Sequence, residues 1–92
     1  MKTPRPIANP WRNDDAISVC SDDGVVEFHL SPCEAGLFVE RIEQHRHRAR
    51  VVQFTVFRSI TAFDRWCDAD AVRFDYPVVY VSLKRNGERQ LP

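Results

Sequence analysis

Residues 31–50 constrain the fold more than any other stretch, because they begin with helix-starting residues and end with basic ones. Ser31 can accept a hydrogen bond from a first-turn backbone N–H, and Pro32 suits the first helical position. Glu34 then completes the pattern of a capping box. The next apolar residues have the spacing of one helical face: Ala35, Phe38, Val39 and Ile42. The pattern predicts a helix that ends near residues 44–46, before arginines enter its apolar face.

Residues 16–30 predict a β-hairpin. Asp23 and Gly24 form a turn signal, because glycine adopts a positive φ without penalty. With the turn placed there, Val19 faces Phe28, Ile17 faces Leu30, Cys20 faces Glu27, and Ser18 faces His29. This register gathers apolar side chains on one side of the hairpin, namely Ile17, Val19, Val26, Phe28 and Leu30. We therefore expect that side to face the core.

The second half of the chain predicts two more strands and one more helix. Residues 51–57 are β-branched and aromatic, which predicts a strand whose buried face is Val52, Phe54 and Val56. A helix is expected near residues 60–70, capped by Ser59 or Thr61. Residues 72–76 read as a short strand or an extended connection. Residues 78–84 predict a strand with Val79, Val81 and Leu83 on one face, followed by a hairpin turn at Asn86 and Gly87.

These elements occur in the order β-β-α-β-α-β, which predicts an α+β fold. We expect a two-layer sandwich with a mixed four-stranded sheet and two helices packed on one face. Residues 1–13 contain Pro4, Pro6 and Pro10, so they predict a flexible N-terminal arm. Residues 14–92 form the single predicted domain.

Composition excludes several classes of protein. The chain has 92 residues, 43% of them hydrophobic, and carries no formal net charge. It contains no apolar run long enough for a membrane span and no secretory signal, which favours the cytoplasm. Three widely spaced cysteines do not form a disulfide framework, so we expect reduced thiols. Zero net charge also disfavours a dedicated nucleic-acid binder and makes self-association plausible.

One basic cluster is a candidate binding site for a polyanion or a partner. It consists of His45, Arg46, His47, Arg48 and Arg50, with Lys2, Arg5 and Arg12 as conceivable helpers. Arginine forks match phosphate geometry. Two arguments weigh against the site: the expected helix would turn the negative end of its dipole toward an anion, and the acidic hairpin could pair with the arginines.

The positions of cysteine and histidine in the sequence do not indicate a catalytic or metal site. Cys20 and His29 share the outer hairpin face and are the best available nucleophile and base, but no orienting third group is evident. The spacing of histidine and cysteine matches no structural zinc site. We predict no catalytic residues, no metal and no cofactor. Cys33 and Cys67 are interpreted as small core residues.

Two aromatic residues, Phe57 and Tyr80, are predicted to lie on an uncovered sheet face near Val51 and Val78. An exposed apolar patch of this kind is typical of an interface. The leading hypothesis is therefore a non-enzymatic protein-interaction or regulatory module that associates with itself or with another protein. The alternatives are nucleic-acid or polyanion binding through the basic cluster, and a small enzyme of unknown reaction. Salt dependence distinguishes the interaction module from the polyanion binder, because polyanion binding weakens steeply with ionic strength.

Overall fold

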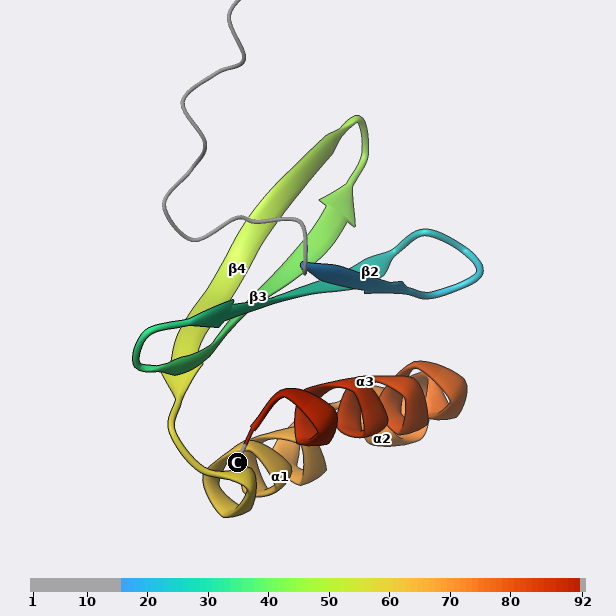
Figure 1. The fold of residues 1–92 in the computed structure, drawn as a ribbon. Coiled ribbons are helices and arrows are strands. Elements are labelled where there is room, and N and C mark those ends of the chain that lie inside the picture. Colours follow the sequence, from blue (N-terminus) through green and yellow to red (C-terminus); the bar gives the residue numbers. More distant parts are fainter. Residues whose placement is uncertain (1–15, 92) are drawn as a thin grey trace, which may run out of the picture.

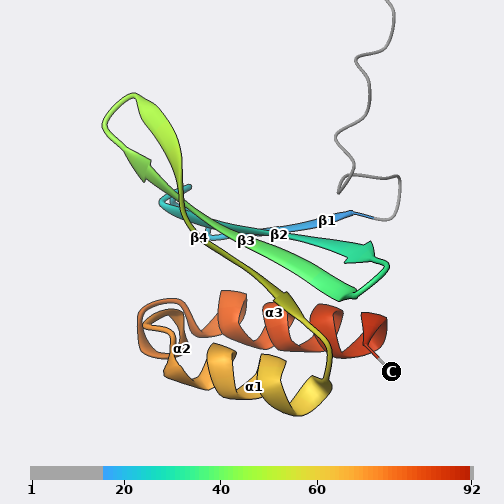
Figure 2. The ribbon, with the colours of Figure 1, turned by 90° about the vertical axis from the view of Figure 1, so that its left-hand side faces the viewer.

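The computed structural model describes residues 16–91, which form four strands followed by three helices. The strands are β1 (Ile17–Cys20), β2 (Val26–Cys33), β3 (Gly36–His45) and β4 (Arg48–Phe57), and the helices are α1 (Ile60–Ala69), α2 (Val72–Asp75) and α3 (Pro77–Gln90). Each strand pairs antiparallel with the preceding one, so the sheet order is β1-β2-β3-β4. All of the helices cover the same face of the sheet (Figures 1 and 2). The predicted arm, residues 1–13, lies outside the described residues.

The predicted order β-β-α-β-α-β is wrong, and so is the mixed sheet. The expected helix at residues 31–45 is instead the end of β2, a turn, and β3. Ser31 pairs with Phe38 and Pro32 with Leu37, so the residues of the supposed helix cap belong to a strand. Leu37 and Val39 are both fully buried, which is the period of a strand. Pairing of β3 with strands on both sides outweighs the local capping signal.

The hairpin prediction is confirmed down to its register. Ile17 pairs with Leu30, Ser18 with His29, Val19 with Phe28, and Cys20 with Glu27. Val19, Val26, Phe28 and Leu30 are buried, and Ile17 packs against the same core. Gly24 has φ +75°, which is the backbone conformation that the turn signal required.

The helix expected near residues 60–70 is confirmed as α1. Ser59 is its N-cap, and the Ser59 hydroxyl oxygen accepts a hydrogen bond from the Ala62 backbone N–H at 3.2 Å. Phe63 and Cys67, four residues apart, are buried on its inner face. The ring of Phe63 lies edge-on to Phe57 of β4, with centroids 5.5 Å apart, which packs the helix layer onto the sheet.

The strand expected at residues 78–84 and the turn at Asn86 and Gly87 are wrong. These residues belong to α3, which begins at Pro77 and buries Val79, Leu83 and Gly87 at intervals of one helical turn. Residues 72–75 form the short helix α2 rather than a strand or an extended connection. The β-branched residues between 78 and 81 favour a strand, but the burial of every fourth residue is the pattern of a helix.

The predicted strand at residues 51–57 exists within β4, but the prediction of its buried face is wrong. Val52, Phe54 and Val56 are exposed. Phe57 is buried instead and pairs with Leu37, which is buried on the helix-covered face. Antiparallel partners share a face, so the register of β3 places Phe57 inside and turns Phe54 and Val56 to the uncovered face.

Candidate functional site

The β3–β4 hairpin extends as a two-stranded ribbon beyond the other strands and the helices (Figure 2). Its end, residues 44–50, is exposed at every position, and we call this segment the ribbon tip. His45 pairs with Arg48, which leaves Arg46 and His47 as the turn. Arg46 has φ +56°, a left-handed conformation that few residues other than glycine and asparagine adopt readily. The candidate basic residues therefore lie at a strand turn, not at a helix end.

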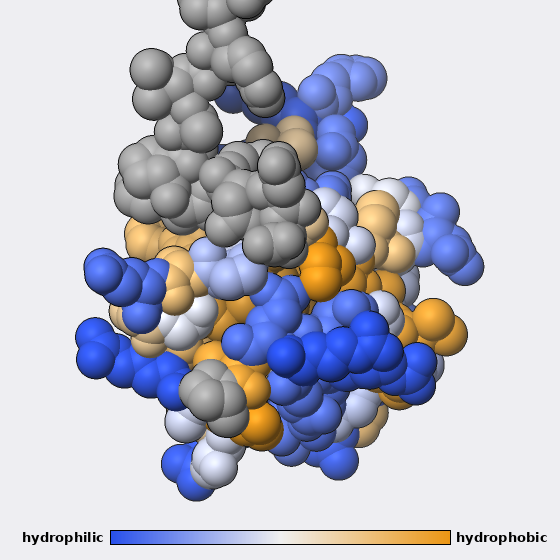
Figure 3. Space-filling view, in the orientation of Figure 1, coloured by the Kyte–Doolittle hydropathy of each residue, from blue (hydrophilic) through white to orange (hydrophobic). Residues whose placement is uncertain are grey.

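The ribbon tip collects the positive charge of three arginines. Within residues 16–91, Arg46, Arg48 and Arg50 form no ion pair. The acidic side chain opposite Arg50 is Glu43, and it contacts Arg41 and His45 instead. Hydrophilic side chains gather at the end of this hairpin in the space-filling view (Figure 3). The helix-dipole argument against the cluster loses its basis, since no helix ends there. Within residues 16–91, no acidic side chain pairs with these arginines.

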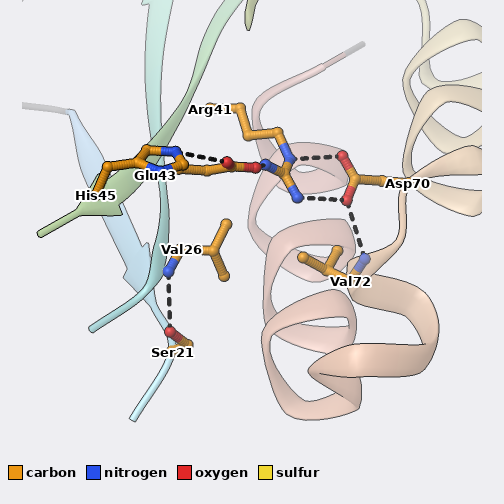
Figure 4. Close-up of polar contacts among 7 residues, drawn as sticks. All are labelled: Ser21, Val26, Arg41, Glu43, His45, Asp70 and Val72. Carbon is orange, nitrogen blue, oxygen red and sulfur yellow. Dashed lines mark hydrogen bonds and ion pairs between the residues drawn. The ribbon is translucent and has the colours of Figure 1, made fainter. Parts of the chain in front are cut away.

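A polar clasp holds the base of the ribbon against the helix layer (Figure 4). Arg41 of β3 donates from Nε and Nη2 to the two carboxylate oxygens of Asp70, at 2.9 and 3.2 Å. Its Nη1 also contacts the carboxylate of Glu43, which in turn lies 3.2 Å from His45 Nε2. Asp70 accepts a further hydrogen bond from the N–H of Val72, the first residue of α2, at 2.9 Å. No local sequence pattern indicates this clasp, because Arg41 and Asp70 are 29 residues apart in the chain.

The clasp is largely shielded from water. The side chains of Arg41 and Asp70 are 12% and 8% exposed. Burial works against the charge of Arg41, but hydrogen bonds and attraction from Asp70 and Glu43 outweigh it and raise the Arg41 pKa above its ordinary value. The guanidinium also lies 5.6 Å from the centre of the Phe28 ring. Arg41 is therefore a structural cation whose charge is balanced by Asp70 and Glu43. The arginines of the ribbon tip have no such partners among residues 16–91.

The uncovered face of the ribbon carries an apolar surface. Val51, Val52, Phe54 and Val56 of β4 are exposed there, with Phe54 at 68%, and we call these residues the outer patch. Phe54 lies beside Phe38 of β3, with ring centroids 6.3 Å apart, at a hollow of about 540 Å³. β4 is also the last strand of the sheet, and no strand within residues 16–91 pairs with its outer edge. Exposed apolar side chains on an open strand edge are typical of a pairing surface.

The two residues predicted for an interface lie elsewhere. Phe57 is 6% exposed and contacts the rings of Phe63 and Trp66. Tyr80 lies half-buried on α3 and donates its hydroxyl hydrogen to Asp68 at 2.5 Å. Neither residue belongs to the outer patch. The exposed aromatic residue on the uncovered face is Phe54, which the alternating pattern had assigned to the core.

Cys20 and His29 do not form a catalytic pair in the described structure. The Cys20 thiol donates to the Ser21 carbonyl oxygen at 3.3 Å, whereas His29 Nε2 lies 2.6 Å from Glu27 and its Nδ1 lies 3.8 Å from Glu40. Burial raises the pKa of the Cys67 thiol to about 12, which makes it inert as a nucleophile at neutral pH. In the part of the chain that the structure describes, no three histidine, cysteine or acidic side chains come together to hold a metal.

A second polar bridge joins the two layers at the β1–β2 turn. The Tyr76 hydroxyl, at the start of α3, donates to the Asp23 carboxylate at 2.8 Å. Asp23 also accepts from the Ser21 hydroxyl at 2.7 Å and from the Val25 N–H at 3.0 Å. The hydrogen bond from Ser21 is the main reason that the Asp23 pKa lies below its ordinary value, with those from Val25 and Tyr76 adding to it. A hollow of about 260 Å³ lies beside this bridge and is lined partly by Asp22, Asp23 and Asp75.

Comparisons of the chain with protein-family models, with curated proteins and with solved structures found no match. None of the helices within residues 16–91 is long and apolar enough to cross a membrane.

Proposed function

We propose that this protein is a non-enzymatic interaction module that self-associates through β4. The observation that carries the proposal is the outer patch, because it combines exposed apolar side chains with an open strand edge. Removing such side chains from water favours association by about 25 cal/mol per Å² of apolar surface. The unpaired backbone groups of an edge strand add directional hydrogen bonds, which select an extended strand as the partner.

A second copy of the chain is the partner that this edge fits best. Two β4 strands related by a two-fold axis would pair antiparallel, so each copy would present the same surface to the other. If the axis passes near Thr55, Phe54 of one copy faces Val56 of the second copy on the uncovered side. The same register carries the arginines of the two ribbon tips to opposite ends of the joint sheet. Apolar groups then meet at the centre while like charges stay apart.

Charge and redox chemistry agree with this role. The formal net charge is zero, so two copies approach without overall electrostatic repulsion. Cys20, Cys33 and Cys67 are all free thiols, which supports placing the module in the reducing cytoplasm as part of the same proposal.

The test is a change of Phe54 and Val56 to lysine together, because charged side chains block edge pairing. Sedimentation velocity over about a hundredfold range of protein concentration measures the effect, since association obeys mass action. We expect the wild-type mass to rise from monomer toward dimer and the Phe54→Lys/Val56→Lys variant to stay monomeric. Thermal unfolding of the variant should match that of the monomeric wild type, because both side chains are exposed.

The control is Val78→Lys, which introduces one lysine at an exposed valine of α3, in the helix layer. This variant should associate like the wild type. A wild type that remains monomeric at every concentration would overturn the proposal. So would a Val78→Lys variant that dissociates as completely as the β4 variant, because association would then not depend on the outer patch.

A further inference from the structure

We propose that the ribbon tip binds the phosphate backbone of duplex DNA by entering its major groove. This site and this ligand are distinct from the self-association surface, which lies on the uncovered face of β4. The ribbon has four features that favour DNA binding: its shape, the charge of its arginines, its attachment to the helix layer and the backbone conformation of Arg46.

The shape of the ribbon suits a DNA groove. The major groove of B-form DNA is about 12 Å wide and admits a two-stranded β-ribbon. Strands in such a ribbon lie about 4.8 Å apart, which leaves room for side chains on both sides. Residues 44–50 are exposed throughout, and the hairpin reaches beyond the rest of the sheet, so the tip can enter a groove without a collision of the helix layer (Figure 2).

The charge of the ribbon tip is available to a ligand. Arg48 and Arg50 are two residues apart on one strand, so their side chains project to the same side, and Arg46 extends from the turn. Within the described residues none of these arginines has a carboxylate partner, and Glu43 is engaged by Arg41 and His45. Guanidinium groups bind phosphate through paired hydrogen bonds. The zero net charge of the whole chain therefore conceals a local basic site.

The ribbon is anchored before any ligand arrives. At its base, Arg41 binds Asp70 of the α1–α2 connection. At the first residue of the ribbon tip, the Gln44 N–H donates to the Val25 carbonyl oxygen at 2.8 Å. The contact between Arg41 and Asp70 ties the ribbon to the helix layer (Figure 4). An element that is ordered in advance loses less conformational entropy on binding.

The backbone at Arg46 supports a role for its side chain. A φ of +56° favours glycine or asparagine, and an arginine there adopts a conformation that carries a steric cost. Strained residues of this kind cluster at functional sites. Arg46→Asn thus distinguishes the charge of the side chain from the strain of the backbone. Asparagine adopts this φ at lower cost but carries no positive charge.

The test uses the full-length protein and fluorescence anisotropy of a short labelled DNA duplex at low salt. With three phosphate contacts, log Kobs should fall with log salt at a slope of about −2.7, or about fortyfold from about 50 to about 200 mM. The Arg46→Gln/Arg48→Gln/Arg50→Gln variant should lose this binding. Arg46→Asn should reduce the slope by about 0.9 while the unfolding midpoint stays equal or rises.

The matched control removes three exposed arginines from the helices, as Arg65→Gln/Arg85→Gln/Arg89→Gln, with the same change in net charge. It should bind the duplex like the wild type. The proposal fails if the wild type shows no salt-dependent binding, or if the helix variant loses as much affinity as the tip variant. Binding to anionic phosphatidylserine vesicles without binding to the duplex would also overturn it. None of these outcomes bears on the sedimentation of the Phe54→Lys/Val56→Lys variant. Self-association through β4 and DNA binding by the ribbon tip can therefore be refuted independently.

Discussion

Gly87 is the residue whose meaning changes most between sequence and structure. Next to Asn86 it signals a hairpin turn, but it lies inside α3 and faces the ring of Phe63. A Cβ atom there would collide with that ring. Glycine is thus needed at this position for close helix packing and not for a turn, although it weakens an isolated helix.

We predict that Gly87→Ala lowers the free energy of unfolding by about 1–3 kcal/mol, as overpacked core substitutions do. Helix propensity alone would raise stability by about 1 kcal/mol, so the sign of the change decides between the two effects. Urea denaturation monitored by circular dichroism measures it. Arg85→Ala, an exposed change on the same helix, is the control and should stay within about 0.5 kcal/mol of the wild type. A more stable Gly87→Ala protein would contradict the packing argument.

At the scale of elements, the ribbon and the helix layer depend on the clasp between Arg41 and Asp70. The two side chains come from β3 and from the connection that follows α1. Asp70 follows α1 directly and also accepts a hydrogen bond from the N–H of Val72, the first residue of α2, so one residue links β3, α1 and α2. The base of the ribbon is thus attached to the helices by a shielded ion pair.

Arg41→Met should lower the free energy of unfolding by about 3 kcal/mol, because it leaves the carboxylate of Asp70 shielded from water without a cation. Methionine keeps much of the apolar volume, so the loss reflects the charge and its hydrogen bonds. Chemical denaturation gives the value. Lys84→Met removes a more exposed ion pair, that with Asp68, and should cost clearly less. Equal losses in the two variants would contradict the structural role of the clasp.

Secondary structure could be predicted where a turn or cap signal and the apolar period of one short segment agree. The hairpin of β1 and β2 and the helix α1 are the examples, and both are confirmed. In residues 36–45 the apolar positions fit both a helix and a strand, so local residues could not decide. The neighbouring strands decided, because β3 hydrogen-bonds to β2 and to β4 along its length. The same ambiguity affected α3, where Pro77 was the helix-start signal that the β-branched residues concealed.

At the scale of the whole molecule, hydrogen bonds between residues far apart in sequence join the sheet to the helix layer. They also make the free energy of unfolding depend on pH. The Asp23 carboxylate, in the β1–β2 turn, holds Tyr76 at the start of α3. Because hydrogen bonds from Ser21, Val25 and Tyr76 lower the Asp23 pKa, its ionised form stabilises the folded protein. Such a contribution is present above the unfolded pKa and disappears as the pH falls through the folded one.

Asp23→Asn should therefore be less stable than the wild type at pH 7. The difference in free energy of unfolding should shrink once the pH falls below 3.8, the ordinary pKa of an aspartate. Urea denaturation of both proteins from neutral to acid pH measures the difference. Asp22→Asn removes the same charge one residue away and should show a smaller difference at pH 7. A gap between the wild type and Asp23→Asn that persists unchanged in acid would contradict this account.

The sequence by itself determined the members of the basic cluster, the hairpin register and the helix after Ser59, because each depends on residues close together in the chain. Tertiary structure alone decided that the cluster lies at a ribbon turn, that β4 exposes Phe54 and Val56, and that Arg41 meets Asp70. These outcomes depend on which strands pair and which sheet face the helices cover. Such pairings are contacts between distant segments, and a local pattern of apolar residues is compatible with more than one of them.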